Sequence, residues 1–298
     1  MPIALPPPQL LEIAGVDAIA FAHAQFCNDV IALPVGCWQW NAWLSPQGRV
    51  RYFFVLLRDA EDRLRLLLRG GDAEVMRTAL ARFVFRAKLS LRTIVDTQVL
   101  GCDEAETLTR LARLPVGNKL MRHRDSVGLM LPGSSPRWLL LRAPAAPATA
   151  AIAADMIASA EALNRWRLDD IRVGLPELAP ALEDQLLPNW LGLGRLQAIS
   201  ASKGRYPGQE IMARLHFKGG NKRGLYRLQL RCDALPATGM PLLDTGRATA
   251  EVGIVVMAAW TTAGHAEALA ALTNTAAADG LRTEPVIADE IKVISGFT

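Results

Sequence analysis

The sequence has few cysteines and histidines, and neither residue type falls into a recognisable metal or redox pattern. Four cysteines occur in 298 residues (Cys27, Cys37, Cys102 and Cys232), and no two of them form a C-x-x-C pair. This spacing predicts buried thiols in a reducing compartment, not a disulfide framework or a metal knuckle. The four histidines form no H-x-x-x-H or H-E-x-x-H pair, so we expect no metal site.

Long uncharged apolar runs are also missing. A membrane-spanning helix needs about 18–20 consecutive apolar residues, and no such stretch occurs. Residues 1–8 lack the basic and apolar regions of a signal peptide. We therefore expect a cytoplasmic protein with no membrane partner. The chain also has no Walker A loop, no G-x-G-x-x-G turn and no nucleophile-elbow serine.

Length and composition are those of a compact protein of two or three domains. The chain is 51% hydrophobic and 21% charged, with a formal net charge of +4. Most of its 33 basic residues are arginine. An arginine excess accompanies binding of phosphates, carboxylates or nucleic acid, but a GC-rich coding bias produces it too, and the many alanines point to that bias.

The hydrophobic periodicity predicts a mixed α+β chain with mostly antiparallel strands. Expected helices cover 17–32, 72–88, 96–118 and 145–165, and expected strands cover 38–44, 49–57, 63–68, 89–95, 138–141 and 211–214. The segment 166–202 has no clear period, which is typical of a functional segment. From residue 222 onward, short strands such as 225–230 and 252–256 favour a small barrel. Residues 263–280 fit a helix or a surface insertion equally well.

The densest polar motif lies at 203–210 and continues into a second basic turn. Glycine and proline make a tight turn there, which lets backbone N–H groups approach a ligand closely. A solvated hairpin loop is the alternative interpretation. The candidate residues are Lys203, Gly204, Arg205, Tyr206, Gly208, Gln209, Glu210, Arg214, Lys222 and Arg223.

This run resembles the K-G-C-[FY]-x-G-Q-E signature of the YgfZ-type folate-binding proteins, relatives of the glycine cleavage T protein, an aminomethyltransferase. Every fixed position matches except the third, where Arg205 replaces the family cysteine. Residues 166–176 resemble the family run W-x-x-x-x-I-E-x-G-[IL]-P, with Arg172 in place of the glutamate. Looser matches lie at 15–17, 25–30, 46–49, 86–89 and 185–191, so the resemblance covers about residues 10–260.

The resemblance implies an aminomethyltransferase-like α+β architecture. Two interleaved α+β sub-domains are expected over residues 1–220, followed by a small C-terminal β-barrel over 221–298. It also implies a central pocket for tetrahydrofolate or a derivative, lined by Trp166, the 203–210 loop and the 221–223 turn. The Trp166 indole would stack on the ligand's rings, and a purely structural core tryptophan is the alternative.

The function implied is that of a folate-binding accessory protein that supports iron–sulfur enzymes, including tRNA-modifying ones. Arginine cannot act as a thiolate, so Arg205 favours binding over catalysis. One alternative is a folate-dependent one-carbon transferase or demethylase, with Glu210 or Asp169 as its acid or base. A second is a non-catalytic scaffold for a protein or RNA partner, although the composition does not by itself favour direct nucleic-acid binding.

Overall fold

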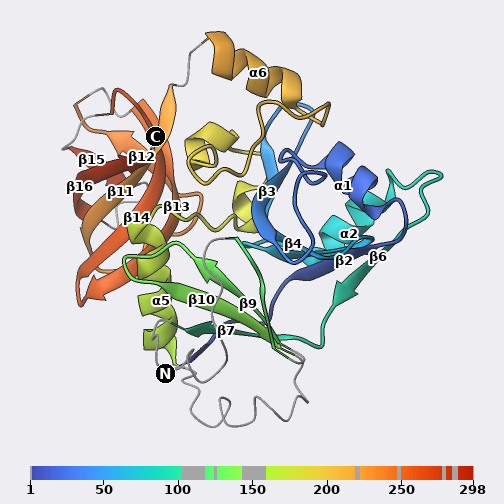
Figure 1. Cartoon of the computed structure of the whole chain (residues 1–298). Coiled ribbons are helices and arrows are strands. Elements are labelled where there is room, and N and C mark those ends of the chain that lie inside the picture. Colours follow the sequence, from blue (N-terminus) through green and yellow to red (C-terminus); the bar gives the residue numbers. More distant parts are fainter. Residues whose placement is uncertain are drawn as a thin grey trace.

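The computed structural model describes residues 2–102, 118–123, 126–142, 159–218, 222–246, 250–276, 280–283 and 288–297. Its strands form three antiparallel sheets (Figure 1). The first sheet has the order β1-β7-β10-β9-β8. Its strands are β1 (Ile3–Ala4), β7 (Gln98–Cys102), β8 (Met121–His123), β9 (Ser126–Leu131) and β10 (Arg137–Arg142).

The second sheet contains the predicted meander of β3 (Trp38–Leu44), β4 (Val50–Ala60) and β5 (Arg63–Leu68). It continues through β2 (Leu10–Ala14) to β6 (Ser90–Ile94). Strand β4 is buried on both faces because its side chains alternate between two cores. Phe53 and Val55 face the central core, whereas Phe54 and Leu56 pack towards the helices α1 (Ala18–Gln25) and α2 (Ala73–Ala81).

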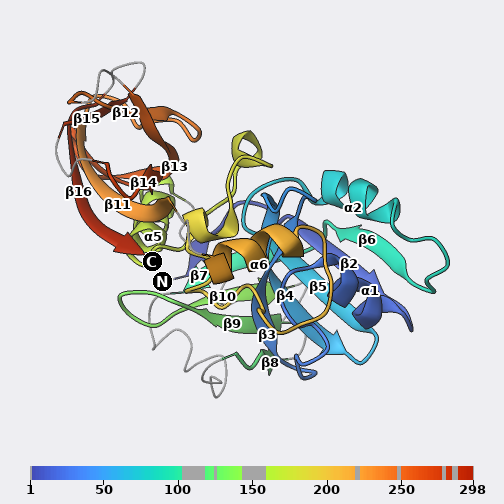
Figure 2. The ribbon, with the colours of Figure 1, turned by 90° about the horizontal axis from the view of Figure 1, so that it is seen from above.

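The C-terminal sheet is strongly curved and wraps beside helix α5 (Ala160–Arg172) (Figures 1 and 2). Its order is β15-β12-β13-β14-β11-β16. The strands are β11 (Arg223–Cys232), β12 (Pro241–Asp244), β13 (Ala250–Thr262), β14 (His265–Thr273), β15 (Leu281–Thr283) and β16 (Ala288–Phe297). No ladder joins the edge strands β15 and β16 in the described residues, so closure into a full barrel stays a prediction.

Between α5 and β11 the chain is largely irregular, as predicted. It contains two short 3-10 helices, η2 (Pro180–Leu182) and η3 (Pro188–Leu191), and the helix α6 (Gln209–Lys218). The expected strand at 211–214 is therefore wrong. The apolar run there, Ile211–Met212–Ala213, was too short to distinguish a strand from a helix by its period. Glu210 and Arg214, which pair at i,i+4 spacing, are the helical signal in this segment.

Other predicted elements differ in extent or type. Helix α1 ends at Gln25 instead of residue 32, and α2 ends at Ala81 instead of residue 88. The expected helix at 96–118 is wrong at its start, where β7 forms, and residues 103–117 lie outside the described part. Helix α5 covers the end of the helix expected at 145–165, of which residues 145–158 are not described, and continues to Arg172, into the segment that was expected to be irregular. Residues 265–273 form strand β14, so both the helix and the surface insertion considered for 263–280 are wrong there.

Candidate ligand-binding site

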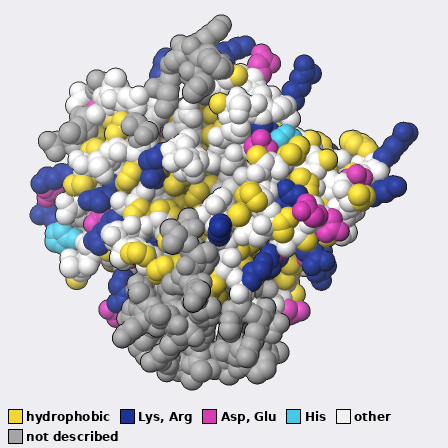
Figure 3. Space-filling model, in the orientation of Figure 1, with side chains coloured by type: hydrophobic (Ala, Val, Ile, Leu, Met, Phe, Trp, Pro, Cys, Tyr) yellow, Lys and Arg dark blue, Asp and Glu magenta, His cyan; other side chains and the backbone are white. Residues whose placement is uncertain are grey.

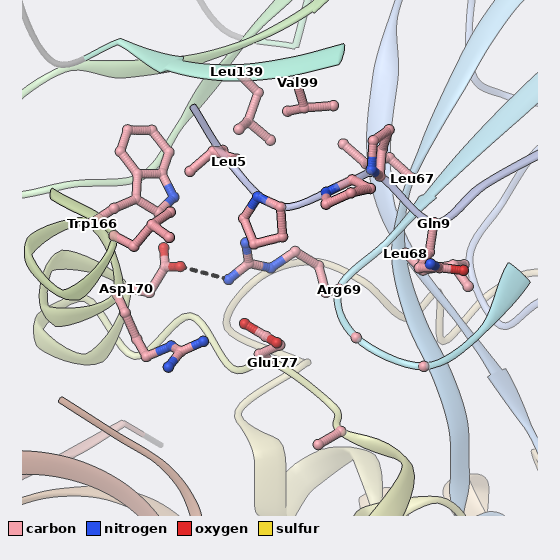
Figure 4. Close-up of a pocket in the computed structure, with 18 of the residues that line it drawn as sticks. Leu5, Gln9, Leu67, Leu68, Arg69, Val99, Leu139, Trp166, Asp170 and Glu177 are labelled. Carbon is pink, nitrogen blue, oxygen red and sulfur yellow. Dashed lines mark hydrogen bonds and ion pairs between the residues drawn. The ribbon is translucent and has the colours of Figure 1, made fainter. Parts of the chain in front are cut away.

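A cavity of about 330 Å³ lies where the N-terminal segment, the end of β5 and helix α5 meet (Figure 4). Leu5, Val99 and Leu139 form an apolar side of it. Charged side chains line the other side, namely Arg69, Arg167, Asp170 and Glu177. Its size and its mixture of apolar and convergent polar groups are those of a small-molecule site.

Trp166 lines this cavity and is also firmly packed. The indole is 6% exposed and lies against the backbone of β7, where a Cβ built at Gly101 would be 2.7 Å from the ring. The guanidinium of Arg137, on β10, lies 4.8 Å from the centroid of the indole ring. Only a residue without a side chain permits this approach, so Gly101 and Arg137 fix the orientation of the indole.

A buried carboxylate with two arginine partners lies next to Trp166. Asp170, one helical turn further along α5, is 2% exposed and accepts from Arg69 Nη2 at 2.7 Å and from Arg137 Nη2. Arg137 also donates to the carbonyl oxygens of Pro132 (2.8 Å) and Trp166 (3.2 Å). Two guanidinium groups share one carboxylate, so the cluster carries an excess positive charge at the cavity wall.

Arg69 and Glu177 are the polar groups of the cavity with capacity left for a ligand. Burial lowers the pKa of Arg69, but the carboxylates of Asp170 and Glu177 raise it, and the net shift is upward. Its buried Nε has no hydrogen-bond partner among the described residues. The Glu177 carboxylate likewise accepts no hydrogen bond and forms no ion pair with any other described residue. The cavity thus presents the Glu177 carboxylate as an acceptor and the guanidinium groups of Arg69 and Arg167 as donors.

The 203–210 loop does not line this cavity. Lys203 is 6% exposed and points into the protein, where Nζ donates to the carbonyls of His23, Phe26 and Asn28 at the C-terminal end of α1. A cation there satisfies carbonyls that the helix leaves open. Burial lowers the pKa of Lys203 to about 8. The lysine therefore holds α1 in place.

Two other residues of the loop lie in a second cavity of about 250 Å³. Tyr206 and Gln209 line it together with Met212 of α6. Burial raises the pKa of the Tyr206 hydroxyl, so this group stays protonated and can donate a hydrogen bond. Trp166 does not line this second cavity.

The remaining predicted residues have structural or exposed positions. Gly208 has a φ of +81° and touches the turn at Ser45–Gly48. Gly204, Arg205 and Lys222 are exposed. Glu210 and Arg214 pair with each other at 3.2 Å on the outer face of α6, and the Arg223 guanidinium lies 5.0 Å from the Trp190 ring. A role of these residues in ligand binding stays a prediction.

Arg172 does not enter the cavity either. Its guanidinium donates to Glu267 on β14, with an N–O distance of 3.1 Å. The residue at the family's glutamate position therefore joins α5 to the C-terminal sheet. Sequence reasoning missed Glu177, Arg69 and Arg137, which come from three separate segments. Glu177 had a weak signal, since it directly follows the Trp166–Pro176 run.

The four cysteines are buried, as predicted. Burial raises the pKa of Cys27 to about 12, and its Sγ donates to the carbonyl of Ala198 at 3.4 Å. In the described residues no group of three or more His, Cys, Asp or Glu side chains is arranged to hold a metal ion. None of the described helices is both long enough and apolar enough to span a membrane.

Comparison with known proteins gives relatives over most of the chain. No family model matches. The chain is 25% identical over 278 residues to the tRNA-modifying protein YgfZ of Sodalis glossinidius, covering 91% of this chain and 84% of that protein. It is 27% identical over 271 residues to the YgfZ of Pectobacterium atrosepticum, covering 89% and 81%. The resemblance to YgfZ-type proteins is confirmed.

Two further comparisons give a similar sequence and a similar structure. An uncharacterised protein of Haemophilus influenzae is 27% identical over 219 residues, which are 73% of this chain and 69% of that protein. The glycine cleavage system aminomethyltransferase T of Bartonella henselae matches the structure with a TM-score of 0.74 at 14% identity, covering 99% of this chain and 84% of that one. The chain therefore has the aminomethyltransferase fold.

Proposed function

We propose that this chain binds a tetrahydrofolate derivative in the Trp166 cavity and acts in connection with tRNA modification, as the name of its YgfZ-type relatives suggests. The observation that carries the proposal is the cavity itself. It combines a fixed indole, an apolar wall, an acceptor carboxylate and the two arginines Arg69 and Arg167. These are the features that a ring system with one donor-rich edge and an anionic tail requires.

Glu177 takes the part of the missing family glutamate in this proposal. The amino-pyrimidine edge of a pterin carries N–H donors, and a carboxylate that accepts two of them is a charge-assisted partner. Arg172 cannot accept such bonds, and it points to Glu267. Asp170 already accepts from Arg69 and Arg137. Glu177 is the cavity carboxylate whose oxygens remain available.

The other parts of the ligand match the rest of the lining. The benzoyl ring is apolar and would pack along Leu5, Val99 and Leu139 beside Trp166. The glutamate carboxylates need cations, and Arg167 lies exposed on the cavity side of α5. The Asp170 cluster holds Arg69 rigidly, so little side-chain entropy would be lost when its Nε meets a ligand oxygen.

The test is a calorimetric titration of the purified protein with tetrahydrofolate. Loss of the indole in Trp166→Ala should weaken binding by about 1–2 kcal/mol, or about five- to thirty-fold, whereas Trp166→Phe retains a ring and should bind more nearly as wild type. Glu177→Gln should weaken binding about 10- to 100-fold, because a hydrogen bond to a charged group contributes about 1.5–3 kcal/mol.

Glu161→Gln provides the matched control. The Glu161 carboxylate is exposed at the first turn of α5, the helix that carries Trp166, and it does not line the cavity. Its replacement should leave the affinity unchanged. If tetrahydrofolate binds wild type, Trp166→Ala and Glu177→Gln equally well, the ligand occupies another site. No binding to wild type would reject the folate proposal as a whole.

Support of iron–sulfur enzymes belongs to the same proposal and rests on the resemblance alone. The two candidate acids of the transferase alternative do not line the cavity: Glu210 is on the outer face of α6, paired with Arg214, and Asp169 is not among the lining residues. We therefore favour a binding factor over an aminomethyltransferase.

A further inference from the structure

The segment between helix α2 and strand β6 projects from the edge of the molecule (Figure 1). Residues 75–95 contain five of the 33 basic residues and none of the 29 acidic ones. The rest of the chain consequently has one more acidic than basic residue, although the whole chain has a net charge of +4. The excess positive charge is thus concentrated in one short, projecting segment.

Three of these cations are not tied to acidic side chains. Arg77 pairs with Glu74 and Arg92 pairs with Glu12. The side chains of Arg82, Arg86 and Lys88 are exposed and form no ion pair within the described residues. Figure 3 shows basic side chains extending outward at this edge next to apolar ones. Such an arrangement suits a polyanion.

An aromatic ring lies among the three cations. Phe85 is 86% exposed, the highest exposure of any large hydrophobic side chain in the described residues. Phe83 is 42% exposed and packs edge-on against Trp43, with ring centroids 6.2 Å apart. One ring is therefore anchored while the other presents its faces to solvent, directly followed by Arg86.

The base of the segment is fixed. The Lys88 N–H donates to the Asp17 carboxylate at 2.6 Å, and β6 pairs along its length with β2. Gly15 packs so tightly that a Cβ there would be 2.4 Å from the Lys88 carbonyl oxygen. Because both ends are held, the ring and the cations between them are presented without a large ordering cost on binding.

We propose that this projecting segment binds single-stranded RNA, with an unpaired base stacked on Phe85 and phosphates held by Arg82, Arg86 and Lys88. Alternating cations and an open aromatic face are the combination by which proteins hold single strands. An anionic membrane would attract the same cations. Membrane-inserting segments bury a continuous apolar face, however. In residues 75–95 the large apolar side chains that are more than half exposed, Val75, Phe85 and Val95, lie ten positions apart with basic residues between them.

The test is fluorescence anisotropy with a labelled, unstructured RNA of about twelve nucleotides, within the usual range of single-strand site sizes. Phe85→Ala should weaken binding about 5- to 100-fold, the equivalent of one lost base stack. Phe85→Tyr keeps an aromatic ring and should bind as tightly as wild type. Arg86→Gln and Lys88→Gln should each reduce the slope of log affinity against log salt by about 0.7. Arg165→Gln, an exposed arginine on α5, should change neither quantity.

Two further measurements separate the alternatives. A duplex of the same sequence should bind more weakly than the single strand. Vesicles of phosphatidylcholine with and without phosphatidylserine should show no binding that depends on Phe85. The inference is overturned if wild type does not bind the RNA at low salt, if Phe85→Ala binds it as tightly, or if only vesicles are bound. Phe85 does not line the Trp166 cavity, so Phe85→Ala should bind tetrahydrofolate as wild type does. The two proposals can therefore fail independently.

Discussion

At the scale of single residues, two substitutions set this chain apart from the family patterns it resembles, and both have a structural consequence. Arg205, which the sequence pattern aligns with the family's cysteine, is exposed. Arg172 stands at the glutamate position and pairs with Glu267. The chemistry that a cysteine at 205 would supply is absent from this loop.

The first residue-scale prediction concerns thiol reactivity. All four cysteines are buried, and burial raises the pKa of Cys27 to about 12, which suppresses the thiolate at neutral pH. Iodoacetamide at pH 8 should therefore modify none of them in the native protein within an hour, and all four after unfolding. Mass spectrometry counts the modified thiols.

Arg205→Cys is the positive control for that experiment. Position 205 is exposed, so the new thiol should react under native conditions and raise the count by one. Rapid modification of a native cysteine in wild type would instead mean that the reactive thiol has moved to another position. Loss of tetrahydrofolate binding after such a modification would place that thiol at the ligand site.

At the scale of elements, regular patterns were predictable from sequence and tertiary contacts were not. Strands 38–44 and 63–68 were correctly bounded because their apolar residues alternate and turns delimit them. The helix expected at 72–88 was too long. Its N-terminus was recognisable from Asp72, which accepts from the N–H groups of Glu74 and Val75, but its end depends on contacts such as that of Phe83 with Trp43.

The candidate site was less predictable than the fold. Trp166 was predicted from its match to the family run, and it lines the cavity, but its neighbours there come from β5, β10 and the loop after α5. No local pattern records that Arg69 and Asp170, about a hundred positions apart, share a hydrogen bond. The 203–210 loop was correctly recognised as a turn rich in polar groups. Its lysine and glycine, however, serve α1 and the 45–48 turn.

The element-scale prediction tests that structural role. A Cβ at Gly208 would be 2.6 Å from the Ser45 carbonyl oxygen, and the residue has a φ of +81°. Gly208→Ala should therefore lower the free energy of unfolding by about 1–3 kcal/mol from the backbone conformation alone, with the close contact adding to it. Urea unfolding followed by circular dichroism measures the change.

Gly204→Ala is the matched control in the same loop. It has no positive φ, and no atom lies within 4 Å of a built Cβ. This variant should stay within about 0.5 kcal/mol of wild type. Equal stability of the two variants would mean that the loop does not pack on the 45–48 turn in solution.

At the scale of the whole molecule, helix α5 joins the N-terminal sheets to the C-terminal sheet. Its Trp166 packs on β7, whereas its Asn164 side chain donates to the Trp260 carbonyl at 2.8 Å and accepts from the Trp260 N–H at 2.9 Å on β13. We propose that the chain divides near residue 220 and that α5 carries the contact between the two parts. A ligand in the Trp166 cavity would then contact the helix that connects the two parts.

The last prediction separates the two polar links that α5 makes to the C-terminal sheet. Asn164 satisfies both backbone groups of Trp260, and its removal leaves a partly buried donor and acceptor without their partner. Asn164→Ala should therefore lower the free energy of unfolding by about 1–3 kcal/mol. Arg172→Ala should cost no more than about 1 kcal/mol, because that pair is partly exposed and Glu267 retains Arg227 at 3.6 Å. Calorimetric thermal unfolding and urea unfolding followed by circular dichroism measure the stability of both variants. A larger loss from Arg172→Ala than from Asn164→Ala would mean that the ion pair, and not the amide, holds α5 against the C-terminal sheet.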